Sequence, residues 1–304
     1  MPLDHTFPGR DGEFHFLDWG GSGPLLHLAH ATGYCAGVYT PLAERLTPGL
    51  RVVGPGQKNW RGPFCADRLP GGEKTKVPAD PRKLKNWNIF VEDLAAFVRN
   101  QGSPIVAVGH SRGGTVSLML AVKYPELVRA LILIDPTILP FSWMWWWCLA
   151  KKTGVARFVP IAYRAAGRRQ VWPDRETIFQ SYRRKETMKR WEEAFLKAYV
   201  REGTQETADG QVAWRCDPAW EARCFATCPH DVWQFVPQVR CPTLVIYGRE
   251  SDTFLKPAAE RFKRKLPSAE LVGMENTSHF VPMERPEETA AAIFEFLRHN
   301  RIIT

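Results

Sequence analysis

Short apolar runs alternate along this chain with segments whose apolar residues recur at helical spacing. The runs 105–108 and 131–134 are apolar or small throughout, as in strands that are buried on both faces of a parallel sheet. In segment 88–100 the apolar residues instead return every three or four positions, which is typical of a helix packed on one face. The alternation predicts an α/β fold with a mostly parallel central sheet flanked by helices.

The same pattern gives the other elements of the core. We expect strands at 14–19, 25–29, 50–54, 105–108, 131–134, 243–247 and 269–272. We expect helices at 38–46 and 88–100, and a last helix from Pro286 onward.

The stretch from residue 138 to 236 has a different character. It contains no convincing strand, it holds nine of the twelve tryptophans, and its sixteen Lys and Arg exceed its eleven Asp and Glu. We therefore divide the chain into an α/β core, residues 1–137 and 237–304, and a helical, Trp-rich cap, residues 138–236. Such a cap would cover the carboxyl edge of the sheet, where open α/β sheets bind their ligands.

Ser111 stands between Gly109 and Gly113, directly after the strand 105–108 and before the small and apolar run 115–121. A chain that turns this sharply from strand to helix strains the residue at its apex and leaves no room for side chains on the neighbours. The apex side chain then projects beside the N–H groups of the helix start. This is a suitable place for a nucleophile.

A serine hydroxyl needs a base to take its proton, and histidine does this best near neutral pH. His279 lies in the loop between the last expected strand and the last helix, and Asp252 follows the apolar strand 243–247. We predict that Ser111, Asp252 and His279 are catalytic, with the carboxylate orienting the imidazole.

The Gly-x-Ser-x-Gly sequence around Ser111 and the chain order Ser111, Asp252, His279 resemble the α/β-hydrolase superfamily. The resemblance is to its serine esterase and lipase-like branch, which has a helical lid. The likeness extends over nearly the whole chain outside the cap. It includes the strand end 131–136, the acid loop 248–252, the base loop 278–280 and the segment 30–33.

The resemblance implies further site residues. One is an oxyanion hole in which the N–H groups of Arg112 and Thr32 hold the oxyanion, although Ala31 stands where the family has a glycine. The resemblance also offers Asp135 as an alternative to Asp252 for the residue that orients the histidine, because some relatives carry their carboxylate at that position. The plainer interpretation, which we favour, is that Asp135 forms a turn and that Asp252 is the acid.

We take His30, Trp143 and Phe280 as candidate pocket residues, with a purely structural role as the alternative for His30. After strand 50–54 the sequence departs from the family pattern. Trp60 and Phe64 in that polar loop either border the pocket or belong to a plain surface loop.

The run 141–147 is the most aromatic of the chain. We favour a lid helix packed on the core, since apolar stripes usually serve packing. A hydrophobic substrate pocket is one alternative. A patch that touches lipid, with Lys151 and Lys152 near anionic headgroups, is another, and we expect peripheral membrane contact less than packing.

Composition narrows the class of protein. The net charge is +9, but the basic residues are scattered or mixed with acids and form no nucleic-acid motif, so we expect no nucleic acid as a partner. Seven cysteines, an odd number, indicate reduced thiols in a cytoplasm rather than a disulfide framework. The first residues do not read as a secretory signal, and no apolar run is long enough for a membrane span.

One cluster could in principle hold zinc: Cys216, Cys224, Cys228 and His230. Its spacing matches no common zinc pattern, so we expect no metal.

We predict a serine hydrolase that cleaves carboxylic esters of apolar acyl groups through an acyl-enzyme, without a metal or organic cofactor. The alternatives are hydrolysis of another acyl bond, such as an amide, a lactone or a carbon–carbon bond, and a ligand receptor or signalling protein of the same fold with slow turnover.

Overall fold

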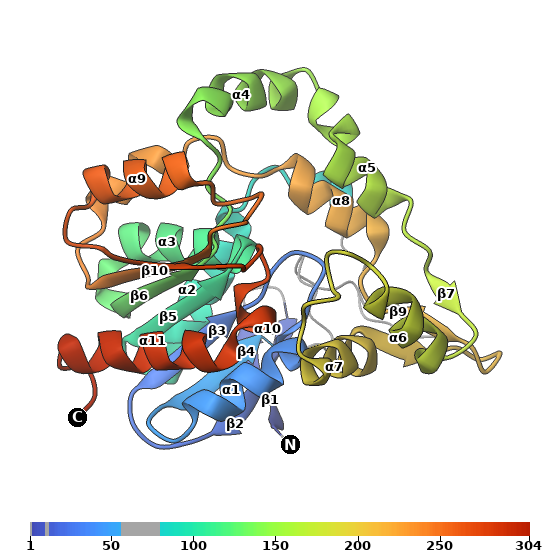
Figure 1. Cartoon of the computed structure of the whole chain (residues 1–304), viewed down its shortest axis with the longest axis horizontal. Helices are drawn as coiled ribbons and strands as arrows, with labels where there is room; N and C mark the ends of the chain where they lie inside the picture. The colour runs from blue at the N-terminus through green and yellow to red at the C-terminus, as the bar shows by residue number, and fades with distance from the viewer. Residues whose placement is uncertain (1, 10–11, 56–79) are drawn as a thin grey trace.

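The central sheet has eight strands among the residues that the computed structural model describes, which are 2–9, 12–55 and 80–304. These strands are β1 (Leu3–Gly9), β2 (Gly12–Gly20), β3 (Leu25–Ala29), β4 (Arg51–Pro55), β5 (Ile105–His110), β6 (Val128–Ile134), β10 (Thr243–Gly248) and β11 (Glu270–Met274). Their order across the sheet is β1-β2-β4-β3-β5-β6-β10-β11 (Figure 1). Trp60 and Phe64 lie outside the described residues.

The sheet is parallel from β4 to β11, with an antiparallel hairpin of β1 and β2 at one edge. This confirms the mostly parallel sheet and each of the seven expected strands. The sequence pattern missed β1, because its side chains from Leu3 to Thr6 are exposed and form no apolar run.

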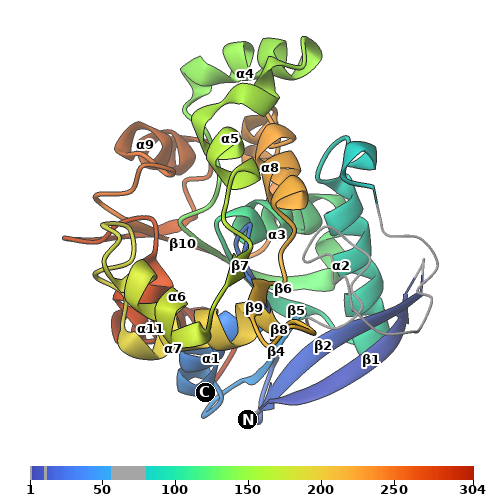
Figure 2. The ribbon, with the colours of Figure 1, turned by 90° about the vertical axis from the view of Figure 1, so that its right-hand side faces the viewer.

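Helices cover both faces of the sheet (Figures 1 and 2). Those of the core are α1 (Thr40–Leu46), α2 (Asn88–Gln101), α3 (Arg112–Lys123), α9 (Lys256–Lys265), α10 (Val281–Glu284) and α11 (Pro286–His299). Alternate residues of β5 enter two separate apolar clusters: Ile105 and Ala107 belong to the one that includes residues of α2, α3 and α9, whereas Val106 and Val108 belong to the one that includes residues of α1 and α11. A strand buried in this way must be apolar at every position, which explains the continuous run.

Between β6 and β10 the chain forms the inserted segment 138–236, which adds no strand to the central sheet. Its helices are α4 (Met144–Lys152), α5 (Pro160–Ala166), α6 (Arg175–Arg183), α7 (Glu193–Gly203) and α8 (Pro218–Ala226). The segment is not wholly helical, which corrects the sequence prediction. It includes a small antiparallel sheet in the order β7-β9-β8, formed by Val171–Trp172, Val212–Trp214 and Thr204–Glu206. These strands are two or three residues long, too short to show a periodic pattern.

The two ends of the inserted segment lie together. The indole Nε1–H of Trp233 donates a hydrogen bond to the carbonyl of Leu139 at 2.8 Å. The segment therefore leaves the core and returns to it at one place. Within the described part of the chain, no helix combines the length and the apolar content that crossing a bilayer would need.

Candidate active site

Ser111 forms the tight turn between β5 and α3. Its backbone has φ 55° and ψ −119°, a region that residues with side chains rarely adopt. A Cβ on Gly109 would lie 2.3 Å from the carbonyl carbon of Gly113, and one on Gly113 would lie 2.2 Å from the carbonyl oxygen of Ala29. Both glycines are therefore required by close backbone approach, as the sequence pattern predicts.

Two contacts tie Ser111 to the end of β6. Its N–H donates to the carbonyl of Ile134 at 2.9 Å, and its Oγ lies 3.2 Å from the hydroxyl of Thr137. The hydroxyl of Thr115 in turn donates to the carbonyl of Thr137 at 2.9 Å. Sequence reasoning did not single out Thr137, whose side chain meets the candidate nucleophile.

His279 is paired with Asp135. Nδ1 of the imidazole lies 2.7 Å from Oδ1 of the carboxylate, which is fully buried. With the Nδ1 proton directed at the carboxylate, the neutral ring presents Nε2 as its proton acceptor. The ring of His279 also lies against that of His110, with centroids 4.9 Å apart, and so beside the strand end that carries Ser111.

The sequence prediction that Asp252 orients the histidine is wrong. Asp252 is exposed, and its carboxylate accepts a hydrogen bond from the neighbouring Thr253 hydroxyl at 3.1 Å. Asp135 has the buried position instead, and its carboxylate also accepts from the N–H of Gly248 at 2.9 Å and from the hydroxyl of Ser251 at 2.6 Å.

Asp135 is also the turn former that the sequence suggests, with a positive φ of 41° directly after β6. Forming this turn and contacting the imidazole of His279 are therefore compatible in one residue. β6 and β10 are neighbours, so a carboxylate at the end of β6 lies within reach of the loop after β10.

His110, the residue before Ser111, joins two loops of the site. Its ring lies 2.9 Å from the carbonyl of His279 through Nε2 and 2.7 Å from the hydroxyl of Tyr39 through Nδ1. The same hydroxyl accepts the N–H of Ala31 at 3.0 Å. Because a carbonyl only accepts, Nε2 carries the proton and Nδ1 accepts from Tyr39. Complete burial holds the pKa of His110 well below its usual value, which agrees with a neutral ring.

The predicted oxyanion donors lie on either side of this network. Arg112 is the first residue of α3, where the helix offers no carbonyl to its N–H groups. Thr32 is buried in a turn closed by the N–H of Tyr34 and the carbonyl of Ala31, with Gly33 at a positive φ of 79°. The oxyanion role of both residues stays a prediction.

His30 supports the site from behind. Its side chain is 1% exposed, and Nδ1 lies 2.8 Å from the carbonyl of Ala31. Nη2 of the buried Arg112 is 3.4 Å from the same nitrogen. One nitrogen cannot donate to a carbonyl and accept from a guanidinium at once, and the shorter contact indicates that it donates. Burial lowers the pKa of His30 well below its usual value. A structural role suits this position better than the pocket role.

Phe280 begins an aromatic wall next to His279, with ring centroids 5.4 Å apart. Trp191 from the inserted segment packs 5.1 Å from Phe280, and Tyr34 continues the wall at 5.9 Å from Trp191. Trp143, the third candidate pocket residue, is 54% exposed on the short helix η4 (Phe141–Trp143). It belongs to an outer surface rather than to this wall.

An ion pair borders the same region. Nη1 of Arg168 lies 3.0 Å from a carboxylate oxygen of Glu221, and both side chains are largely buried. Glu221 reaches the turn of Thr32, since a Cβ on Gly33 would lie 2.4 Å from its Oε1. Burial raises the pKa of Glu221. Sequence reasoning missed this pair, because its partners are far apart in the chain.

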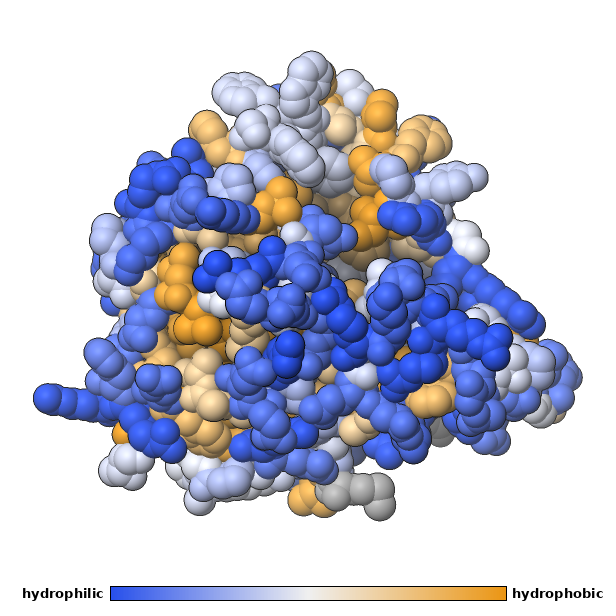
Figure 3. Space-filling model, viewed as in Figure 1, coloured by the Kyte–Doolittle hydropathy of each residue, from blue (hydrophilic) through white to orange (hydrophobic). Residues whose placement is uncertain are grey.

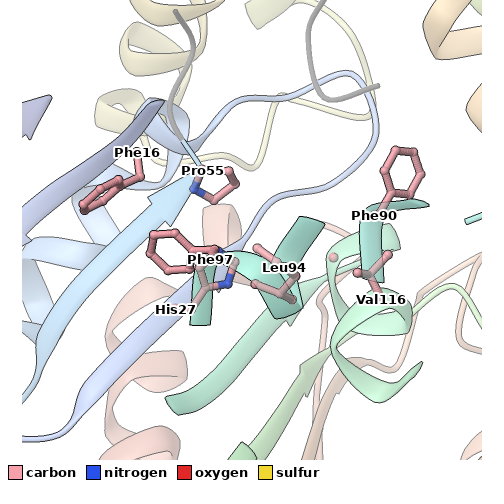
Figure 4. A pocket seen from close by; sticks show the side chains of 9 residues that line it. Phe16, His27, Pro55, Phe90, Leu94, Phe97 and Val116 are labelled. Carbon is pink, nitrogen blue, oxygen red and sulfur yellow. The ribbon is translucent and has the colours of Figure 1, made fainter. Parts of the chain in front are cut away.

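A small apolar cavity lies between β3, α2 and α3, with room of about 20 Å³ (Figure 4). It is lined by His27 and by apolar side chains, among them Phe97 and Leu94. Nδ1 of His27 has no hydrogen-bond partner among the described residues, and burial lowers the pKa of His27 to about 3. The space is large enough for one water molecule but too small for a substrate.

No three His, Cys, Asp or Glu side chains gather as metal ligands in the described part of the chain. Cys216, Cys224 and Cys228 are buried thiols. Burial raises the pKa of Cys224 to about 11 and that of Cys228 to about 12. The thiols of Cys224 and Cys228 are therefore protonated near neutral pH.

Comparison with known proteins gives a family for this chain and several relatives. A sequence model described as the Alpha/beta hydrolase family matches residues 25–292. Lipase LipV of Mycobacterium tuberculosis is 31% identical over 133 residues, covering 41% of this chain and 42% of LipV. The 2-(acetamidomethylene)succinate hydrolase of Mesorhizobium japonicum is 32% identical over 119 residues, covering 38% of this chain and 37% of that protein. The match thus spans about two fifths of these relatives.

Solved structures extend the likeness over the whole fold. The crystal structure of an E-2-(acetamidomethylene)succinate hydrolase superposes with a TM-score of 0.77 at 20% identity, covering 98% of this chain and all of the other. An alpha/beta hydrolase from Novosphingobium aromaticivorans gives a TM-score of 0.72 at 21% identity, covering 98% of each chain.

Proposed function

This chain belongs to the alpha/beta hydrolase family, and from that premise we propose that it is a serine hydrolase that cleaves carboxylic esters of apolar acyl groups. The observation that carries the proposal is the 2.7 Å contact between His279 and the buried Asp135, next to the strained turn of Ser111. A nucleophile, a base and a group that orients the base are the parts that acyl transfer through a serine requires.

The reaction runs in two halves. Nε2 of His279 takes the proton of Ser111, whose Oγ attacks the ester carbonyl, while the N–H groups of Arg112 and Thr32 stabilise the oxyanion. The imidazolium returns the proton to the leaving alcohol, which leaves an acyl-enzyme. Water, deprotonated by the same imidazole, then attacks the acyl carbon, and the proton passes back to Ser111 as the acid departs. Asp135 stays ionised throughout and stabilises the imidazolium.

The aromatic wall supports an apolar acyl group. Phe280, Trp191 and Tyr34 offer ring faces next to the base, and such surfaces favour hydrocarbon or aromatic groups over charged ones. The named activity of LipV, a lipase, agrees with this substrate class.

Hydrolysis of an amide is the second candidate, favoured by one observation. The relative from Mesorhizobium is named for a succinate that carries an acetamido group. Arg168, next to the turn of Thr32 through Glu221, is a buried cation that a substrate carboxylate could approach, and its Nε has no hydrogen-bond partner among the described residues. An amidase of this kind would hydrolyse an acetamido dicarboxylate faster than an apolar ester.

The first experiment measures hydrolysis of p-nitrophenyl esters from acetate to laurate by the wild type and by Ser111→Ala. We expect wild-type turnover with an optimum in chain length, and a loss of about 10⁵-fold or more in kcat for the variant. Unchanged melting temperatures would establish that both proteins are folded. A folded wild type without turnover of any ester would overturn the ester proposal. Turnover of an acetamido dicarboxylate alone would then support the amidase. Tight binding of a ligand without turnover would support a receptor.

A further inference from the structure

The outer arm, which we define as residues 141–167, exposes most of the large apolar side chains on the described surface. Nine of the twelve such side chains that are exposed among the described residues lie in this arm. Trp145 and Trp146 on α4 are 78% and 74% exposed, and Phe158 on the short helix η5 (Val155–Phe158) is 59% exposed. Exposed apolar side chains that gather in one segment in this way mark an interaction surface.

Packing accounts for only one side of α4. On the inner side, Met144 packs against the core, and both the indole Nε1–H of Trp147 and the ammonium of Lys151 donate to the carbonyl of Cys228, at 2.8 and 3.1 Å. The favoured sequence interpretation, a lid helix packed on the core, therefore holds for this side alone. The opposite side, with Trp145 and Leu149, has no such partner among the described residues.

The charge of the arm has one sign. Residues 141–167 contain four Lys and Arg and no Asp or Glu. Lys152, Arg157 and Arg164 are exposed between the apolar side chains of the arm. Tryptophan rings interleaved with cationic side chains suit the headgroup region of a membrane, where the rings enter the interface and the cations meet anionic lipids.

The arm also lies at one end of the molecule. α4 stands at the top in both ribbon views, beyond the rest of the inserted segment (Figures 1 and 2). In the space-filling view bulky side chains project there, pale because the hydropathy scale rates tryptophan as nearly neutral, with apolar residues beside them (Figure 3). A flat surface can therefore contact α4 without meeting the core.

We propose that the outer arm docks the protein on membranes that contain anionic lipids. A second copy of the chain is a poorer occupant, because a twofold interface through the arm would bring Lys152, Arg157 and Arg164 against their own copies. An anionic bilayer complements both the aromatic and the cationic side chains.

This inference goes beyond the proposed function and is tested by binding rather than by activity. Ser111→Ala protein is sedimented with vesicles of phosphatidylcholine alone and with vesicles that contain about one third phosphatidylglycerol, at low and high salt. We expect strong binding to the anionic vesicles, weak binding to the neutral ones, and release at high salt.

Two variants and two matched controls locate the binding. Trp145→Ser with Trp146→Ser, and separately Lys152→Glu with Arg157→Glu, should each lower the partition coefficient on anionic vesicles by about tenfold or more. The controls are Leu3→Ser, an apolar residue that is 66% exposed on β1, and Arg298→Glu on α11. Both should leave binding unchanged.

Absence of vesicle binding by a folded protein, or binding that survives both double variants, would overturn the proposal. Equal binding to neutral and anionic vesicles would remove its electrostatic part and overturn it as stated. A dimer in light scattering that the tryptophan variant dissociates, without vesicle binding, would assign the arm to contact between copies instead.

Discussion

The imidazole of His110 donates a hydrogen bond to the main-chain carbonyl of His279 across 2.9 Å, so the residue before the candidate nucleophile holds the loop of the candidate base. Through the hydroxyl of Tyr39 the same ring reaches the N–H of Ala31, next to Thr32. Nucleophile, base and predicted oxyanion turn are thus connected by one buried chain of hydrogen bonds.

Tyr39→Phe removes the hydroxyl in the middle of this chain. The N–H of Ala31 and Nδ1 of His110 then lose their partner, and we expect the free energy of unfolding to fall by about 1–3 kcal/mol. We also expect kcat for p-nitrophenyl esters to fall by about tenfold with little change in KM, since the turn that carries Thr32 is less well held. Tyr124→Phe is the control, because its hydroxyl donates to Glu92 on α2, outside the candidate site. Equal kcat for the two variants would contradict a positioning role of Tyr39.

Asp135→Asn separates the two candidate acids when it is compared with Asp252→Asn. An amide beside His279 favours the wrong tautomer of the imidazole, and we expect kcat to fall by about 10³–10⁴-fold. The exposed Asp252 should be replaceable with less than about a twofold change, as is usual for surface positions. Steady-state kinetics, with circular dichroism to check folding, makes the comparison. A larger loss for Asp252→Asn would restore the sequence-based assignment.

Gly248→Ala tests how tightly the loop of His279 is packed on β10. A Cβ there would lie 2.1 Å from the carbonyl oxygen of Ser278, so the loop must move. We expect the free energy of unfolding to fall by about 1–3 kcal/mol. We also expect kcat to fall by more than this loss of stability alone would cause, because His279 directly follows Ser278. Gly167→Ala, with nothing nearer than 3.8 Å to the new methyl group, is the matched control. Wild-type kcat in the Gly248 variant would show that the loop tolerates displacement.

Three buried histidines predict loss of stability in mild acid. The pKa of His27 is lowered to about 3, and those of His30 and His110 lie well below the usual value, in each case mainly through burial. Below about pH 6.5 these histidines bind protons in the unfolded chain but not in the folded protein. Each of the three therefore lowers the free energy of unfolding by up to about 1.4 kcal/mol for each unit by which the pH falls. For His27 this loss continues down to about pH 3.

Urea denaturation from neutral to mildly acidic pH measures this effect. The wild type should lose stability as the pH falls through this range, and His27→Leu should show a shallower slope, since one of the three groups is removed. Identical slopes for the two proteins would mean that His27 does not titrate as its surroundings indicate.

The turn at Ser111 and the strands of the core could be predicted because their sequence patterns are short and continuous. Gly109 and Gly113 each stand two positions from Ser111, and the run 105–108 is apolar throughout because β5 contributes to two clusters. By contrast, Asp135 and Asp252 both follow apolar strands, and neither composition nor spacing distinguishes them. Asp135 is distinguished by the hydrogen bonds that it accepts from Gly248 and Ser251 at the end of the neighbouring strand β10. Both residues are more than a hundred positions from Asp135 in the sequence.

The detailed structure of the inserted segment could be predicted less well than that of the core. Its aromatic content is plain in the sequence, yet whether a tryptophan packs or is exposed depends on which side of α4 it occupies. Trp147 bonds to Cys228 and Trp145 does not, although the two are only two positions apart. The small sheet of β7, β8 and β9 depends on pairing between distant residues, which a local pattern does not record.

The contact between Trp233 and Leu139 has a consequence for how proteins of this kind diversify. The insertion starts and finishes at one point, and Ser111, Asp135 and His279 all belong to the core, so the insertion carries none of these three candidate residues. If Asp252 were the acid, the three candidate residues would still lie in the core, but the end of β6 would carry none of them. A chimera that takes a foreign insertion after Thr137 would therefore keep Asp135 beside His279, but it would have to rebuild the apolar cluster in which Phe195 of α7 packs with Tyr39.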